Sequence, residues 1–242
     1  ESGDAPCYWK FRQYEPWEDP ARGSIPISWC VGAATADVVP DVLAWYYSQA
    51  TPNDYFYSAL SGAGYMNPMA GYGTAYRDAA AVFDDFLTLT GATMKRLDLD
   101  IASIYTVPHT QLDRAEVDRV MQRYARKIPG LKAIAPSMGR NEGDTGDNAN
   151  YTLAGTDVSI FHVLTRWDAQ KVGREWKREN REFLIDDIKR HAPTQRPGFM
   201  HCMALSWTYY PTDLAVVAET LGDEYRFVSL GELDTLLRQA RQ

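Results

Sequence analysis

Apolar and polar positions along the chain form short runs that turn residues separate. Seven of these runs are rich in apolar or β-branched residues and are bounded by turn residues, a pattern typical of buried strands. They cover residues 25–31, 55–60, 93–98, 131–136, 158–165, 198–206 and 225–229. The pattern therefore predicts seven strands spread over the full length of the chain.

Amphipathic runs with helix signals fall between most of these strands. Asp113 and Glu116 form a capping box that opens a helix with one apolar face. A second apolar stripe covers residues 76–87, and Gly91 is expected to end its helix. Further helices are expected over residues 174–190, after Thr212 and after Ser229. Strands and helices are thus predicted to alternate from end to end.

The spacing of the strands determines the expected fold. They recur at roughly the length of a βαβ unit, and crossovers of this length make neighbouring strands pair in parallel. Eight such units close a barrel, one strand more than the seven found. We therefore expect one α/β domain over residues 1–242, a parallel (β/α) barrel of the TIM type. Its first strand is expected upstream of Gly3-Asp4, in an N-terminal segment or domain of a longer parent protein.

Charge and hydropathy narrow the range of partners. The 242 residues carry a net charge of −7, and the densest basic cluster, residues 174–181, is interleaved with Glu. Such a cluster is typical of a solvated helix face and not of a nucleic-acid-binding surface. No apolar run reaches the roughly 18 residues that a membrane span needs. We expect no nucleic-acid partner and no membrane span, and a neutral carbohydrate fits as substrate.

Residue types that bind metals and cofactors are present, but their spacing is wrong. Cys7, Cys30 and Cys202 form no CxxC pair, no two of the four histidines are four residues apart, and there is no HExxH. No GxSxG elbow and no phosphate-binding loop follows a strand. The sequence therefore predicts neither a metal nor a cofactor.

Two carboxyl groups are needed to hydrolyse a glycosidic bond: one protonates the leaving oxygen, and the other attacks or activates water. In one alternating run, Arg96, Asp98 and Asp100 turn to the same side of the predicted strand. We expect Arg96 to pair with Asp98 and Asp100 to lie nearer the strand end, which makes Asp100 the first catalytic candidate. Asp4 is the second candidate, at the end of the missing strand.

A third catalytic candidate lies in the longest predicted loop. Residues 139–155 are polar and rich in glycine, which is typical of a functional loop. Of the acids in this loop, Glu142 is taken as the candidate for the second carboxylate. The alternative for any loop acid is a solvated side chain with no role in catalysis.

Aromatic side chains in loops suit the apolar faces of sugar rings, and their polar atoms reach hydroxyl groups. Such residues, with nearby polar ones, are expected to converge at the end of the barrel where parallel strands finish. The residues expected to bind substrate are Tyr65, Asn67, Trp207, Tyr209, Tyr210, His162, His201 and Asp98. The alternatives are that Trp207 and Tyr209 pack a helix onto the barrel and that the two histidines are core residues.

Three segments carry a resemblance to a known family. Residues 61–68 read Ser-Gly-Ala-Gly-Tyr-Met-Asn-Pro, residues 52–56 lead into them, and residues 207–211 read Trp-Thr-Tyr-Tyr-Pro. The first of these resembles the Gly-x-Gly-Tyr-x-Tyr-Pro motif for which the GxGYxYP family of glycoside hydrolases is named. It matches both glycines, the tyrosine and the proline, and departs at Asn67, where the motif has Tyr.

This resemblance implies a barrel-like domain that follows an N-terminal domain in secreted or periplasmic bacterial proteins. It also implies a first strand that ends in Gly-Asp-Tyr-Asp. Gly3-Asp4 matches the first half of that sequence, whereas Ala5 and Pro6 replace the second half. The second acid of the family pattern is therefore missing here.

The leading functional hypothesis is a glycoside hydrolase that cleaves a poly- or oligosaccharide with a carboxylate pair. The first alternative is a carbohydrate-binding protein on a degenerate barrel, which would use the aromatic residues without catalysis. The second is an enzyme similar to the polysaccharide deacetylases, which would need a cluster of His and Asp around a metal.

Overall fold

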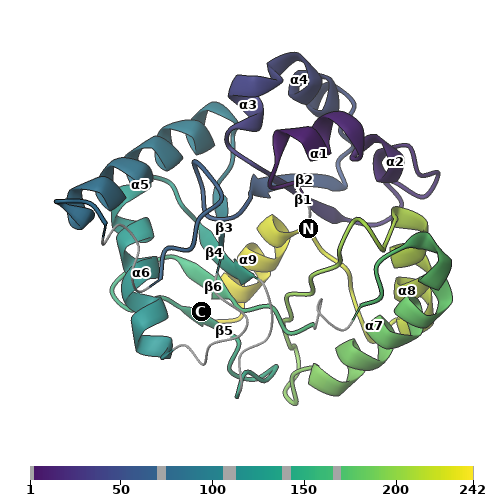
Figure 1. The fold of residues 1–242 in the computed structure, drawn as a ribbon. Helices are drawn as coiled ribbons and strands as arrows, with labels where there is room; N and C mark the ends of the chain where they lie inside the picture. Colours follow the sequence, from purple (N-terminus) through teal and green to yellow (C-terminus); the bar gives the residue numbers. More distant parts are fainter. Residues whose placement is uncertain (1–2, 70–74, 106–112, 138–142, 166–169, 242) are drawn as a thin grey trace.

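The computed structural model describes residues 3–69, 75–105, 113–137, 143–165 and 170–241. Within these residues the strands form one six-stranded sheet in the order β1-β2-β3-β4-β6-β5. Their bounds are β1 Ile27–Val31, β2 Asp54–Ser58, β3 Ile101–Tyr105, β4 Ala133–Ser137, β5 Asn150–Thr152 and β6 Ser159–Phe161. All neighbouring pairs are parallel except β5 with β6 (Figure 1). The fold is a mixed α/β fold.

Helices connect and cover the strands of this sheet. The described residues contain α1 Pro6–Phe11, α2 Tyr14–Trp17, α3 Thr35–Val38, α4 Pro40–Ser48, α5 Ala79–Arg96, α6 Arg114–Lys127, α7 Lys177–His191, α8 Pro211–Leu221 and α9 Leu230–Gln239. A short 3-10 helix, Arg174–Trp176, leads into α7. Because α5 and α6 each join parallel strands, both are crossover helices of the kind that the spacing predicts.

The two faces of the sheet are covered by different helices because side chains alternate along each strand. On one face, Ala102 and Ile104 of β3 pack in a buried cluster with Leu87 of α5 and Met121 of α6. On the other face, Ile101 packs with Ala133, Phe161 and the leucines Leu230, Leu233 and Leu237 of α9. The sheet is therefore buried on both sides, as expected for parallel strands.

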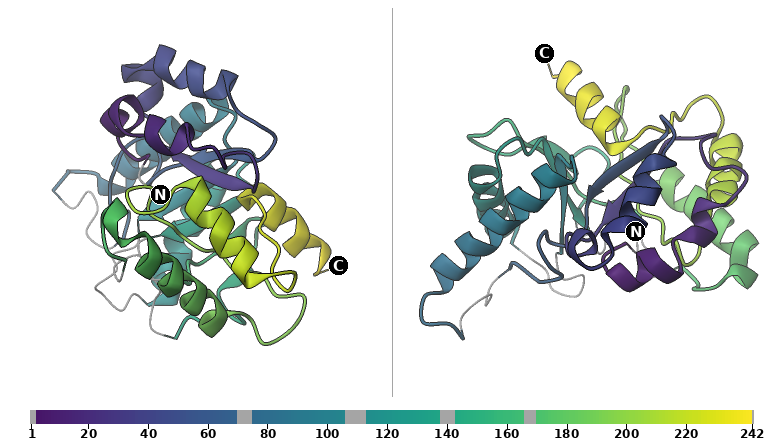
Figure 2. Two further views of the ribbon diagram at one scale, coloured as in Figure 1. Left: turned by 90° about the vertical axis from the view of Figure 1, so that its right-hand side faces the viewer. Right: turned by 90° about the horizontal axis from the view of Figure 1, so that it is seen from above.

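Helix α9 lies across the end of the sheet where the parallel strands begin. The Leu230 amide donates a hydrogen bond to Ser28 Oγ near the start of β1, and Arg238 donates to the Lys132 carbonyl just before β4. The right-hand view of Figure 2 shows α9, in yellow, at the top of the molecule, above the N-terminus. We call this end of the sheet the amino edge and the other end, where the parallel strands finish, the carboxyl edge.

The predicted closed barrel is not confirmed. The sheet is open, with β1 at one edge and β5 at the other among the described strands. Predicted strands 198–206 and 225–229 are not strands, and within the first of these an isolated parallel bridge joins Val163 to His201. An apolar run becomes a strand only when a neighbour supplies its hydrogen bonds, which the hydrophobic pattern alone cannot show.

The predicted strand 93–98 is wrong because α5 continues to Arg96, and the strand that follows is Ile101–Tyr105. Gly91 does not end the helix. A Cβ at Gly91 would lie 3.6 Å from Ile128 Cα, which is an ordinary van der Waals contact, so the packing of α5 beside the end of α6 does not require glycine here.

Asp98 ends α5 in place of the expected glycine. Its φ of 55° is left-handed. The Leu99 amide donates to the Met94 carbonyl at 2.9 Å, and the Asp98 amide donates to the Lys95 carbonyl at 3.4 Å. These two bonds define a Schellman motif, in which the left-handed residue is usually Gly. Leu99 and Met94 share one buried cluster, which supplies the apolar contact that accompanies this motif.

Candidate active site

The loop after β2 carries the glycine-rich motif and lies at the carboxyl edge. Ser61 Oγ donates to the Met66 carbonyl and accepts a bond of 2.9 Å from the Tyr105 amide at the end of β3. The Ala63 amide donates to Thr90 Oγ1 on α5 at 2.9 Å. The motif loop is thereby held to two neighbouring elements, β3 and α5.

The two motif glycines differ in their surroundings. Gly62 has a φ of +123°, and a Cβ there would lie 2.3 Å from Thr90 Cγ2. The backbone conformation and the close approach to α5 both require glycine at this position. Among the described residues, a Cβ at Gly64 would meet nothing within 4 Å. Gly64 therefore makes no close packing contact with the described part of the chain.

Tyr65 and Tyr105 form an aromatic pair at this edge. Their ring centroids lie 5.4 Å apart, and Tyr65 is 53% exposed. This contact puts Tyr65 beside the end of β3, and its expected role in substrate binding stays a prediction. The Asn67 side chain stabilises the local turn, because its Oδ1 accepts a hydrogen bond of 3.0 Å from the Met69 amide.

Asp4 lies beside the carboxyl end of β1. The Gly32 amide donates to the Gly3 carbonyl at 2.7 Å, and the Gly3 amide donates to Cys30 Sγ at 3.2 Å. Gly3-Asp4 therefore has the position next to β1 that the sequence predicts. Partial burial raises the pKa of the Asp4 carboxyl above its usual value.

A second group of aromatic residues lies beyond β1 and joins the N-terminal helices to residues 206–210. Trp207 packs edge-to-face on Tyr8, with ring centroids 5.1 Å apart, and Arg12 lies 5.0 Å from the Trp207 ring. Tyr8 donates a hydrogen bond to Ser206 Oγ at 2.5 Å. Trp207 is 41% exposed, so much of its ring remains available for contact.

Tyr209 and Tyr210 have structural partners. Tyr209 is buried, and its hydroxyl donates to the Asn180 carbonyl on α7 at 2.8 Å, which ties α7 to the start of α8. Tyr210 donates to the Glu15 carboxylate and stacks on the Arg174 guanidinium at 3.7 Å. Tyr209 therefore packs helices together, which was the alternative to substrate binding for this residue.

Asp100 lies at the amino edge and not with Tyr65. It directly precedes β3, accepts a hydrogen bond from the Tyr55 hydroxyl and pairs with Lys132 Nζ at 2.6 Å. The predicted strand 93–98 would have put Asp100 after a strand, whereas in the structure Asp100 precedes one. It was therefore assigned to the wrong edge of the sheet. The expected convergence of Asp100 with Tyr65, Asn67, Trp207 and Tyr209 in one site is therefore wrong.

The expected pairing of Arg96 with Asp98 is also wrong. Arg96 pairs instead with Asp37 at 2.8 Å. The left-handed turn at Asp98 lies between α5 and β3, at the same edge as Asp100. The structure therefore gives Asp98 a position in a helix stop and not among the residues of the carboxyl edge.

His162 follows β6 and belongs to a buried polar network on the face that α6 covers. Its Nδ1 lies 3.8 Å from Asp144 Oδ2, and its Nε2 lies 3.3 Å from the Tyr151 hydroxyl. Asp144 also pairs with Arg114, at the start of α6. Burial lowers the pKa of His162 to about 4, although the Asp144 charge opposes the shift. His162 is therefore neutral at pH 7.

His201 is buried in the segment that bridges to Val163. Its Nδ1 lies 3.1 Å from the Phe161 carbonyl. Since a carbonyl oxygen only accepts, Nδ1 carries the proton in this bond. Burial lowers the pKa of His201 to about 4. Both histidines thus have the satisfied core environment that was the alternative to substrate binding.

Glu142 lies outside the described residues.

Within the described part of the chain, no group of three or more His, Cys, Asp or Glu residues could hold a metal ion. Over the same residues, no helix is long and apolar enough to cross a membrane. Ser61 and Tyr105 are contributors to this edge that the sequence did not identify as site residues. Of these, Ser61 could have been found from its position directly before Gly62.

Comparisons with known proteins agree with this fold. The chain is similar to a solved structure described as a putative hydrolase from Bacteroides thetaiotaomicron VPI-5482, with a TM-score of 0.75 and 21% sequence identity. The match covers 99% of this chain and 44% of that one, so the chain spans less than half the length of the solved relative. At this identity the likeness shows the fold alone. No match is found among curated proteins.

The sequence also matches a family model over nearly its whole length. The model is described as "GxGYxYP putative glycoside hydrolase C-terminal domain" and matches residues 2–238. The motif loop 61–68, with its glycine packed on α5 and its tyrosine at the carboxyl edge, lies within this match. The chain therefore belongs to the GxGYxYP family of glycoside hydrolase-like C-terminal domains.

Proposed function

We propose that the protein is a glycoside hydrolase-like enzyme that cleaves a poly- or oligosaccharide at the carboxyl edge. The observation that carries the proposal is the position of Asp4. Its backbone lies beside the carboxyl end of β1, its carboxyl group has a raised pKa, and the Tyr65–Tyr105 and Tyr8–Trp207 pairs belong to elements on either side of that strand. A carboxyl group between aromatic surfaces is the arrangement that acid-catalysed glycoside cleavage needs.

Asp4 acts in this proposal as the general acid. Burial disfavours the charged carboxylate, so the group keeps its proton to a higher pH than an exposed Asp. An acid with a raised pKa can protonate the leaving glycosidic oxygen. The hydrogen bond from Gly32 to the Gly3 carbonyl fixes the backbone that carries Asp4.

The exposed aromatic faces hold the sugar. Tyr65 is 53% exposed and Trp207 is 41% exposed, and their rings contact those of Tyr105 and Tyr8, respectively. Apolar faces of sugar rings stack on such side chains. Because no described residue packs closely on Gly64, a sugar can approach the backbone of the motif loop there.

Glu142 supplies the second carboxylate in this proposal. It lies outside the described residues, and in the sequence it falls between β4 and β5. The separation of the two carboxyl groups would determine whether the anomeric configuration is retained or inverted.

The test is hydrolysis of a panel of 4-nitrophenyl α- and β-glycosides and labelled oligosaccharides by the wild-type chain, Asp4→Asn and Asp100→Asn. We expect turnover by Asp4→Asn to fall about a hundredfold or more, with sugar affinity and Tm nearly unchanged, because the proton donor is lost. Asp100→Asn is the matched control. It loses its charge at the amino edge, so its activity per folded molecule is expected to equal that of the wild type.

Two results would contradict the proposal. Full turnover by Asp4→Asn would remove Asp4 from the chemistry. Sugar binding by the wild type without release of any reducing end, across the panel, would favour the carbohydrate-binding alternative. That alternative is suggested by Ala5 and Pro6, which stand where the family pattern has its second acid.

A further inference from the structure

Two exposed tryptophan side chains each have a cation beside the ring. Trp207 is 41% exposed, and the Arg12 guanidinium lies 5.0 Å from its ring centroid. Trp176 is 37% exposed, and Lys171 Nζ lies 4.1 Å from its ring centroid. Both distances fall within the roughly 6 Å over which an aromatic face attracts a cation. The same combination of an accessible ring and a positive charge therefore occurs twice.

Contacts through Thr208 bring the two pairs to one part of the surface. Thr208 directly follows Trp207. Its carbonyl accepts a hydrogen bond of 2.8 Å from Arg174, and its Oγ1 donates to the Lys171 carbonyl at 3.5 Å. The segment that carries Lys171 and Trp176 therefore packs beside Trp207. We call this surface the cationic rim, which consists of Arg12, Lys171, Trp176 and Trp207.

The two cations of the rim are only partly neutralised. Lys171 bonds to Asn180 and Thr208 through its backbone, and within the described part of the chain its ammonium group has no ion-pair partner. Arg12 pairs with Glu15 through one nitrogen at 3.3 Å, and its side chain is 48% exposed. The nearby Glu175 carboxylate folds back toward Gly173. Since a guanidinium has several N–H donors, Arg12 can accept a further anionic partner.

The charge beside the rings matters more for a bound sugar than the charge of the whole chain. The net charge of −7 favours a neutral ligand for the surface as a whole. Salt screens exposed charges beyond about 10 Å at 0.1 M ionic strength. A sugar in contact with Trp207 or Trp176 lies well inside that distance from the cation on the ring. The local cations therefore determine which sugars the rim prefers.

We propose that the cationic rim binds carboxylated sugars and that the substrate class is a uronate oligosaccharide. The substrate assignment rests on the proposed function. A sugar ring stacks on a tryptophan, while its carboxylate accepts charge-assisted hydrogen bonds from Arg12 or Lys171. Arg12 caps the end of α1, which begins two residues after Asp4. The N-terminal segment thus carries both the proposed general acid and one cation of the rim.

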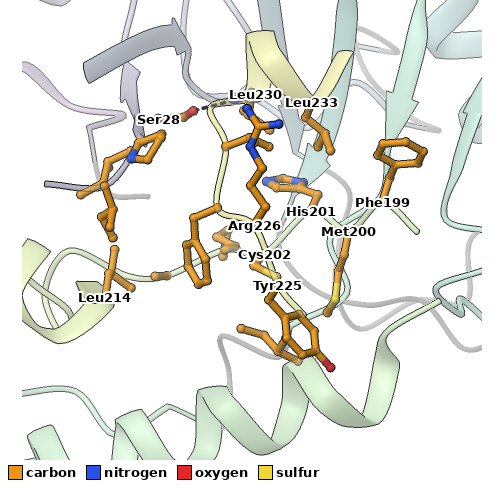
Figure 3. A pocket seen from close by; sticks show the side chains of 18 of the residues that line it. Ser28, Phe199, Met200, His201, Cys202, Leu214, Tyr225, Arg226, Leu230 and Leu233 are labelled. Carbon is orange, nitrogen blue, oxygen red and sulfur yellow. Dashed lines mark hydrogen bonds between the residues drawn. The ribbon is translucent and has the colours of Figure 1, made fainter. Parts of the chain in front are cut away.

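The cavity between β1 and residues 198–204 is a poorer place for such a sugar. Its volume is about 740 Å³. Figure 3 shows apolar side chains such as Phe199 and Leu230 on its walls. Its arginines already have partners, because Arg226 pairs with Glu232 and Arg196 donates to a backbone carbonyl. A carboxylate would lose its hydration there without gaining a free cation.

The test measures binding of uronate oligosaccharides from polygalacturonate, polyglucuronate and alginate, each beside its carboxyl-reduced form. Reduction removes the charge and keeps the linkage, so the pair isolates the contribution of the carboxylate. By isothermal titration calorimetry in about 20 mM salt, we expect at least one acidic oligosaccharide to bind about tenfold more tightly than its reduced form. The preference should largely disappear in about 0.5 M salt, because the rim is exposed.

Two variants test the residues of the rim. Arg12→Gln and Lys171→Gln should each weaken binding of the acidic oligosaccharide about fivefold and leave binding of the reduced form nearly unchanged. Lys10→Gln is the matched control. Lys10 lies 5.1 Å from the centroid of the exposed Phe11 ring on the same helix as Tyr8, so it removes the same charge outside the rim. It should change neither affinity.

Equal affinity for acidic and reduced forms across the panel would overturn the proposal, and so would an equal effect of Lys10→Gln and the two rim variants. The outcome is separable from that of the proposed function. Cleavage of neutral glycosides without any preference for acids would overturn the rim and leave the hydrolase. A preference for acids that depends on Arg12 and Lys171, without release of reducing ends, would support binding by the rim and contradict the hydrolase.

Discussion

At the scale of single residues, Asp98 shows how one side chain can hold a left-handed turn between two elements. Its φ of 55° is costly for most L-residues and tolerated by Asp, whose short polar side chain suits local hydrogen bonds. The position matters because the turn redirects the chain from α5 into β3. The same residue that alternation assigned to a strand is thus a helix stop.

Substitutions at Asp98 should therefore rank by their tolerance of positive φ. We expect Asp98→Gly to preserve or slightly raise the free energy of unfolding, and Asp98→Ala to lower it by about 1 kcal/mol. Asp98→Val should lower it further, because a β-branched residue fits this conformation worst. Urea unfolding of the three variants measures the order. A valine variant as stable as the glycine variant would contradict the assignment.

At the scale of elements, the motif loop combines a structural glycine with one that makes no close packing contact with the described residues. We expect Gly62→Ala to lower the free energy of unfolding by about 2 kcal/mol, because the new methyl group meets Thr90 and the φ of +123° is unfavourable for alanine. Gly64→Ala should change stability by less than about 0.5 kcal/mol, since no described residue lies within 4 Å of a Cβ at this position. Thermal and urea unfolding of the pair measure the difference.

Gly64→Ala also reports on the proposed function. If a sugar approaches the loop at this point, the methyl group should weaken binding while the fold stays intact. The paired variants therefore separate the structural role of the motif from its role in binding. Equal destabilisation by both changes would show that the loop packs differently from the structure.

Elements with strong end signals were predicted well from the sequence. Asp113 is the N-cap of α6, although its side chain accepts from the Ala115 amide and not from the Glu116 amide of the predicted capping box, and Ser229 accepts from the Glu232 amide at the start of α9. Segments 198–206 and 225–229 were not, because their apolar composition cannot reveal whether a neighbouring strand is present. Among the candidate site residues, Tyr65 and Gly3-Asp4 lie at the carboxyl edge, and their roles stay predictions. Asp100 was not, because an error of one element boundary moves a residue from one edge of a parallel sheet to the other.

At the scale of the whole molecule, two buried histidines make stability depend on pH. His162 packs with Tyr151 and Asp144 on the face that α6 covers, and His201 lines the cavity beside Phe161. Burial lowers the pKa of each to about 4, below the usual 6.5. Between pH 6.5 and pH 4 the unfolded chain therefore holds more protons than the folded protein, so acidification favours unfolding.

We expect the free energy of unfolding to be greatest near neutral pH and to fall by roughly 3 kcal/mol between pH 7 and pH 5. The raised pKa of Asp4 acts in the opposite direction, because the folded protein binds that proton more readily than the unfolded chain. One carboxyl group opposes two histidines, so the net change should be a loss. The carboxylates with lowered pKa, such as Asp213, lose their contribution only at lower pH.

Urea midpoints at pH 7 and pH 5 measure the change, and replacing both histidines with Gln should remove most of it. A midpoint that rises on acidification would show that His162 and His201 are charged in the folded protein.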